Sequence, residues 1–93
     1  TPALVAKMEQ TALEMVRPTL AENSDTVGIA INVKHVKATA IGKTVTVEAK
    51  IIKIDGRKIC FEITATDEAG DVIGSAYHER FVVDKQRFMS KLQ

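Results

Sequence analysis

The sequence predicts an α+β protein in which one long helix packs on one face of an antiparallel sheet. Apolar residues recur with a helical period over about the first fifth of the chain, and then with a period of two over most of the rest. Compact turns separate the alternating segments, which is typical of an antiparallel meander. Because an amphipathic helix and a half-apolar sheet each need a covering layer, we expect the two to bury one face against each other.

The composition indicates one globular domain over residues 1–93. Apolar residues make up 45% of the chain, and no run approaches the roughly 20 apolar residues needed to cross a bilayer, so no membrane is expected. The net charge of +1, without a basic stripe, argues against nucleic acid as a partner. The one cysteine, Cys60, has no partner for an internal disulfide, and no secretory signal is present, so we expect a cytoplasmic protein.

The first helix is predicted from about residue 3 to residue 17, with Pro2 suited to its first turn and Pro18 near its end. At about 100° per residue, one arc collects most of its apolar residues, which are Leu4, Val5, Met8, Ala12, Leu13, Met15, Val16 and Leu20. Glu9 falls inside this arc. An unpartnered carboxylate there would cost several kcal/mol, so Glu9 calls for a specific role.

The first strand is predicted from Thr26, with one face that carries Val27, Ile29, Ile31, Val33 and then His35. Gly28 falls on the opposite face in this pattern. The other predicted elements are a turn at 40–43, a strand over 45–51, a hairpin turn at 55–56, a strand over 59–66, a second hairpin turn at 67–71, a strand over 72–83 and a short helix over 85–92 capped by Asp84.

Glu9 and His35 are two titratable residues that point toward the same predicted core. Such a pair can act as general base and orienting group, or as nucleophile and acid. Thr1 lies two helical turns before Glu9 on the same arc and can add a hydroxyl, although a threonine before proline also suits a helix cap. A structural explanation fits the pattern as well. In it, Glu9 forms an ion pair at a subunit contact and His35 is a hydrogen-bonded histidine of the core.

Three stretches closely resemble the fluoroacetyl-CoA thioesterase family of hotdog-fold enzymes. They are HVKATAIGKTVTV from His35, Ile54-Asp55-Gly56-Arg57, and GSAYHER, which ends at Arg80. The resemblance covers nearly the whole chain. It implies that Thr1, Glu9 and His35 are the catalytic residues, that Gly28 lines the acyl pocket and that Arg80 lies near the active site.

The resemblance also implies a hotdog fold, with an antiparallel sheet wrapped around the central helix. We expect the first strand of that fold and the segments that cover the pocket to be missing from this chain. Hotdog proteins usually form dimers with sites at the subunit interface, so we expect a homodimer. The expected activity is hydrolysis of a short acyl-CoA thioester, with no metal and no cofactor beyond the coenzyme A of the substrate. Selectivity for a fluorinated acyl group does not carry over.

Alternatives remain open at this stage. The chain can instead be a non-catalytic acyl-CoA-binding or regulatory hotdog module, or catalyse hydration or dehydration of an acyl thioester. Gly28 can expose its backbone N–H as an oxyanion donor or mark a bulge in the strand. Arg80 can bind an anionic substrate or pair with Glu79. His78 has polar neighbours and is interpreted as structural or interfacial.

Overall fold

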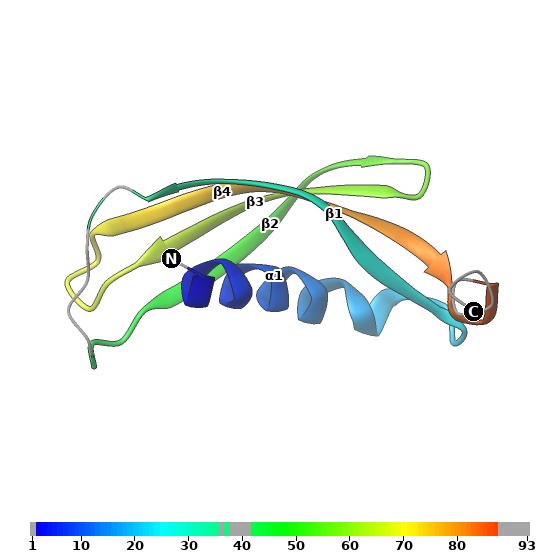
Figure 1. Cartoon of the computed structure of the whole chain (residues 1–93), viewed down its shortest axis with the longest axis horizontal. Helices are drawn as coiled ribbons and strands as arrows, with labels where there is room; N and C mark the ends of the chain where they lie inside the picture. The colour runs from blue at the N-terminus through cyan, green and yellow to red at the C-terminus, as the bar shows by residue number, and fades with distance from the viewer. Residues whose placement is uncertain (1, 36, 38–41, 88–93) are drawn as a thin grey trace.

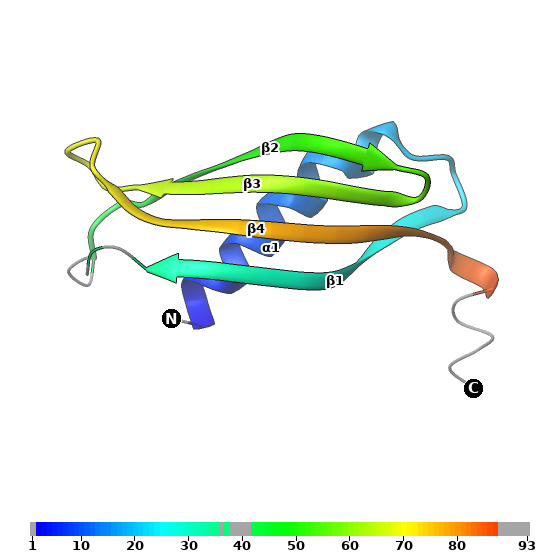
Figure 2. The ribbon, with the colours of Figure 1, turned by 90° about the horizontal axis from the view of Figure 1, so that it is seen from above.

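The computed structural model describes residues 2–35, 37 and 42–87, without the side chains of Pro2 and His35. The elements, in chain order, are α1 (Pro2–Val16), a 3₁₀ turn η1 (Arg17–Thr19), β1 (Ser24–His35), β2 (Thr46–Asp55), β3 (Lys58–Thr66) and β4 (Val72–Asp84). The helix lies below a single sheet (Figure 1). Every paired strand is antiparallel to its neighbour, and the strand order in the sheet is β1-β4-β3-β2 (Figure 2). The predicted order of one helix followed by four strands is confirmed.

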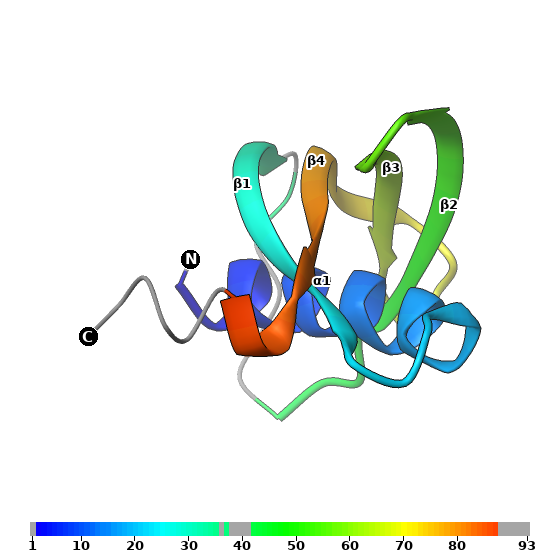
Figure 3. The same ribbon diagram turned by 90° about the vertical axis from the view of Figure 1, so that its right-hand side faces the viewer.

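The helix α1 crosses one face of the sheet diagonally, and the strands curve over it (Figures 2 and 3). The core between the two layers consists of buried apolar residues, namely Met8, Ala12 and Val16 of the helix and Ile59, Phe61, Ile63, Ala65, Ile73 and Ala76 of the sheet. Met15, placed on the apolar arc by the sequence pattern, is instead 43% exposed. In the part of the chain that the structure describes, no helix is long and apolar enough to span a membrane.

The turns follow the local chemistry that the sequence indicates. Gly56 has a φ of +59°, the left-handed conformation that an Asp-Gly hairpin turn favours. In the next hairpin, Asp67 Oδ1 accepts hydrogen bonds from the N–H groups of Ala69 and Asp71. Asp84 caps the terminal helix, because its Oδ1 accepts the N–H of Arg87 at 3.0 Å. The first half of the turn predicted at 40–43 and the part of the predicted terminal helix after residue 87 lie outside the described residues.

A bulge in β1 changes which residues face the helix. Gly28 pairs with Arg80 and Ala30 pairs with Glu79, so Ile29 is an extra residue in the strand. Before the bulge Thr26 and Gly28 face α1, and after it Ile31 and Val33 pack against the core. The prediction of one unbroken face from Val27 to His35 was therefore wrong, and Ile29 is 49% exposed.

Candidate active site

Three of the predicted site residues, Glu9, Gly28 and Arg80, lie together under the first half of β1. A Cβ built on Gly28 would lie 3.3 Å from Glu9 Oε2 and 3.4 Å from both Arg80 Nη1 and His78 Cε1. The lack of a side chain at Gly28 thus lets a carboxylate, a guanidinium and an imidazole approach the same point of the strand. The bulge predicted as one alternative for Gly28 is confirmed next to it, whereas its role as an oxyanion donor stays a prediction.

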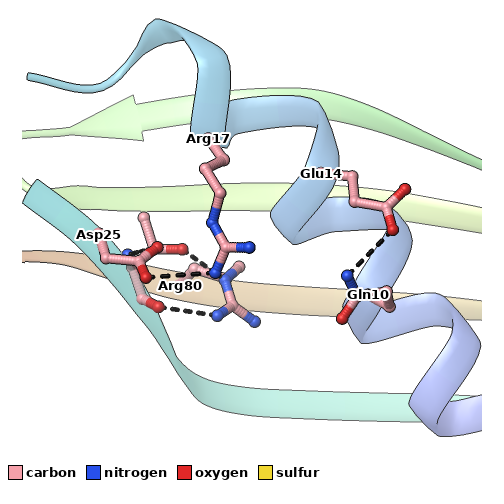
Figure 4. A network of polar contacts seen from close by, with 6 residues as sticks. Gln10, Glu14, Arg17, Asp25 and Arg80 are labelled. Carbon is pink, nitrogen blue, oxygen red and sulfur yellow. Dashed lines mark hydrogen bonds and ion pairs between the residues drawn. The ribbon is translucent and has the colours of Figure 1, made fainter. Parts of the chain in front are cut away.

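The guanidinium of Arg80 is anchored to β1 through Thr26. Arg80 Nε donates to Thr26 Oγ1 at 2.7 Å, and Arg80 Nη2 donates to the Thr26 carbonyl oxygen at 2.9 Å. Figure 4 shows Arg80 beside Asp25, with Arg17 reaching from the end of the helix to the same place. Asp25 forms an ion pair with Arg17, with 3.2 Å between Asp25 Oδ2 and Arg17 Nη2. The Thr26 N–H, and secondarily Arg17, lower the pKa of Asp25.

Arg80 is a buried cation without an ion pair to any described residue. The residue is only 6% exposed, and no described carboxylate lies within 4.0 Å of its nitrogens. Burial lowers the pKa of Arg80, and the charges of Glu9 and Asp25 oppose this shift. A buried, unpaired guanidinium is costly, which favours a functional reason for its place.

The predicted alternative in which Arg80 pairs with Glu79 is wrong. Neighbouring residues of a strand point to opposite faces, and Glu79 lies on the outer face of β4. There its carboxylate accepts the Tyr77 hydroxyl at 2.6 Å and lies 3.7 Å from Lys58 Nζ. The strand β4 also continues to Asp84, so Arg80 does not end it.

His78 completes the cluster and was not among the predicted site residues. It is 1% exposed, its Nδ1 lies 2.8 Å from the Ala30 carbonyl oxygen, and its Nε2 lies 3.4 Å from Arg80 Nη1. The sequence did carry a usable signal, because residues two apart in a strand share a face. Once Arg80 is placed toward the helix, His78 must also face it, whatever the polarity of its neighbours.

The structure does not test whether Thr1 and the side chain of His35 join this cluster. Thr1 and the side chain of His35 lie outside the described residues. The backbone of His35 pairs with Gly74 at the far end of β1, which at ~3.3 Å per residue is about 20 Å along the strand from Gly28. The predicted convergence of Thr1, Glu9 and His35 therefore stays a prediction, and it requires more than one chain to bring His35 to Glu9.

Other features of the described residues do not compete with this cluster. A cavity of about 300 Å³ on the outer face of the sheet contains none of the predicted site residues. Its lining consists of Asn32, Lys34, Ile52, Glu62, Ser75, Ala76 and Tyr77. In residues 2–35, 37 and 42–87, no three His, Cys, Asp or Glu side chains come together as ligands of a metal ion would.

The cluster occurs in a chain whose sequence matches a known family over most of its length. The family model described as fluoroacetyl-CoA-specific thioesterase matches residues 1–86. The chain belongs to this family. It is 36% identical over 93 residues to the fluoroacetyl-CoA thioesterase of Streptantibioticus cattleyicolor, and it spans 66% of the length of that relative.

Solved structures place this family member in the hotdog fold. A crystal structure of the fluoroacetyl-CoA thioesterase FlK superimposes with a TM-score of 0.91 and 36% identity, over 99% of this chain and 67% of that one. A thioesterase superfamily member from Thermus thermophilus superimposes with a TM-score of 0.95 and 25% identity, again over 99% of this chain and 67% of that one. The expected α+β hotdog fold is thereby confirmed.

Proposed function

We propose that the protein hydrolyses a short-chain acyl-CoA thioester, at sites that two copies of the chain build together. Membership of the thioesterase family supports the reaction class. The observation that carries the proposal is the buried, unpaired guanidinium of Arg80 beside Glu9 and Gly28. A fixed positive charge next to a carboxylate, in a site shielded from water, suits a reaction in which negative charge develops on a thioester carbonyl oxygen.

The catalytic residues in this proposal are Thr1, Glu9 and His35, with Gly28 and Arg80 in substrate binding. In one route His35 activates a water molecule against the thioester carbonyl while Thr1 and Glu9 position it. In the other, Glu9 or Thr1 attacks, the thiolate of coenzyme A leaves, and His35 assists hydrolysis of the acyl-enzyme. The burial of Arg80 leaves little of its surface for the phosphates of coenzyme A, so we assign it to the organisation of the site near the acyl group.

The edge position of β1 supports a dimer that completes the site. An edge strand carries backbone groups that can pair with a second copy, and most homo-oligomers have two-fold symmetry. Antiparallel pairing of β1 with its copy, centred between Ile31 and Asn32, would set Gly28 opposite the partner's His35. We therefore propose that Glu9 of one protomer acts with the partner's His35. We also propose that the enzyme works in the cytoplasm and needs no cofactor beyond the coenzyme A of its substrate.

The activity is tested by assaying the full-length protein against a panel of acyl-CoA esters with a thiol reagent. Glu9→Gln and His35→Ala should each lower turnover by about 100-fold or more with an unchanged melting temperature. Glu14→Gln on the exposed face of α1 and Lys34→Ala beside His35 are matched controls and should leave turnover unchanged. Binding of acyl-CoA without turnover by the wild type would instead support the non-catalytic module.

The shared site is tested by mixing the two inactive variants. In a Glu9→Gln and His35→Ala heterodimer, one of the two sites receives a native Glu9 and a native His35. Random exchange of subunits should then restore about a quarter of the wild-type activity. No recovery after confirmed subunit exchange would show that each site draws both residues from one chain.

A further inference from the structure

The neighbours of His78 determine which of its ring nitrogens carries the proton. Its Nδ1 lies 2.8 Å from the Ala30 carbonyl oxygen, which can only accept a hydrogen bond, so Nδ1 must be the donor. Its Nε2 lies 3.4 Å from Arg80 Nη1, which can only donate. The neutral ring with its proton on Nδ1 satisfies both contacts at once, and a protonated ring would place a second cation against Arg80.

The guanidinium of Arg80 is thereby held on three sides. Thr26 accepts from Nε and Nη2, and His78 Nε2 accepts from Nη1. A planar guanidinium with these acceptors has one orientation, which keeps Nη1 on the side of Gly28 and Glu9. Thr26 fixes the far edge of the group, whereas His78 fixes the edge that faces the proposed site.

The other bond of His78 fixes the strand that carries Gly28. Ala30 is the first residue after the extra residue Ile29, so the bond from Nδ1 ties β4 to the bulge of β1. Bulges commonly re-aim residues next to functional sites. From these contacts we infer that His78 is a positioning residue, which orients Arg80 Nη1 through its Nε2 and holds the bulge beside Gly28 through its Nδ1. This inference rests on the proposed thioesterase function.

A purely structural histidine is the competing explanation. The ring of His78 packs against Phe61, with 5.8 Å between ring centroids and 30° between ring planes, and thus fills space in the core. In that case, replacement of His78 would lower stability and leave the kinetics of the folded protein unchanged. Two amide variants separate the explanations, because each keeps one of the two hydrogen bonds.

His78→Asn places an amide near Nδ1 and can retain the bond to Ala30, but it removes the acceptor for Arg80. His78→Gln places an amide oxygen near Nε2 and can retain the acceptor, but it removes the donor to Ala30. For acetyl-CoA hydrolysis by the full-length protein, we expect His78→Asn to lower kcat/KM by about 10- to 100-fold, the usual effect of losing a hydrogen bond to a charged group. His78→Gln should recover most of this loss. Tyr77→Phe, on the outer face of the same strand, is the matched control and should leave kcat/KM unchanged.

A measurement without substrate keeps this inference separate from the proposed function. In ¹⁵N NMR spectra of the full-length protein, His78 should show a protonated Nδ1 and an unprotonated Nε2. The Arg80 Nη protons should exchange slowly in the wild type and in His78→Gln, and faster in His78→Asn. A proton on Nε2, or equal Arg80 exchange and equal kcat/KM in the wild type and His78→Asn, would overturn the positioning role. Wild-type protein that hydrolyses no acyl-CoA would refute the proposed function, while the NMR result would still decide whether His78 orients Arg80.

Discussion

Gly28→Ala is expected to lower the activity of a protein that still folds. The added methyl would lie 3.3 Å from Glu9 Oε2 and 3.4 Å from Arg80 Nη1, closer than nearly all Cβ contacts, so a neighbour must move by a few tenths of an ångström. Hydrogen bonds to Thr26 hold the Arg80 guanidinium in place, whereas the Glu9 carboxylate lies at the end of a flexible side chain. The Glu9 carboxylate should therefore be the group that moves. Crowding of this kind costs about 1–3 kcal/mol, and the lower entropy of the unfolded chain returns about 0.4–1 kcal/mol. The net loss of stability should therefore lie between about 0 and about 2.6 kcal/mol.

Activity should fall as well, because the displaced group is a proposed catalytic residue. A misplacement of about 1 Å can cost about 100-fold in rate, so for a shift of a few tenths of an ångström we expect kcat to fall about 10-fold. Steady-state hydrolysis of acetyl-CoA together with a thermal melt measures both effects. Gly56→Ala is the opposite control, because its φ of +59° should cost about 1–2 kcal/mol of stability in a turn that does not touch the site. Wild-type kcat in Gly28→Ala would refute the idea that the glycine is needed for Glu9 and Arg80 to approach each other.

Three further predictions concern stability. Ile63→Ala, at a fully buried core position, should lower the free energy of unfolding in urea by about 2–5 kcal/mol, whereas Ile54→Ala, at a position 65% exposed, should change it by about 0.5 kcal/mol or less. Backbone hydrogen bonds, chiefly from the Asp71 N–H, lower the pKa of Asp67 in the folded protein. The ionised carboxylate therefore stabilises the fold above the unfolded pKa of about 3.9, and this stabilisation is lost as the pH falls through the lower folded pKa. The melting temperature of Asp67→Asn should thus be below that of the wild type at pH 7, and the gap should close in melts below about pH 4. Asp84→Ala should cost about 1 kcal/mol through loss of the helix cap, and an unchanged melt would show that this cap does not stabilise the fold.

The sequence was sufficient for elements whose pattern is local. The helical period, the Asp-Gly turn at Gly56 and the alternation of β3 each depend on neighbouring residues alone, and all three are confirmed. The position of Glu9 could also be expected, because a charge on an apolar face needs a partner or a function, whereas that of Arg80 was implied by the resemblance to the family. The hotdog fold itself was predicted from the resemblance to a family, because local sequence patterns do not determine how the helix and the strands are arranged.

The rest of the site depends on contacts between distant parts of the chain. The bulge in β1 exists only in relation to β4, so strict alternation placed Gly28 on the wrong face. The position of His78 beside Arg80 was not expected, because its polar neighbours, Tyr77 and Glu79, belong to the outer face of the sheet. Its hydrogen-bond partner, Ala30, lies on a strand 48 residues away in sequence, a pairing that no short window contains.

The extra residue in β1 makes the two halves of this strand geometrically independent. Deletion of Ile29 would restore regular pairing between β1 and β4. The side chains on one side of the deletion, either before or after it, would then point to the opposite face of the sheet. Either the half with Thr26 and Gly28 or the half with Ile31 and Val33 would then face outward. The strand can thus vary in sequence at many positions but tolerates no change in its length at this one. A one-residue gap here in a related sequence would therefore mark a chain that has lost this site or reversed one half of the strand.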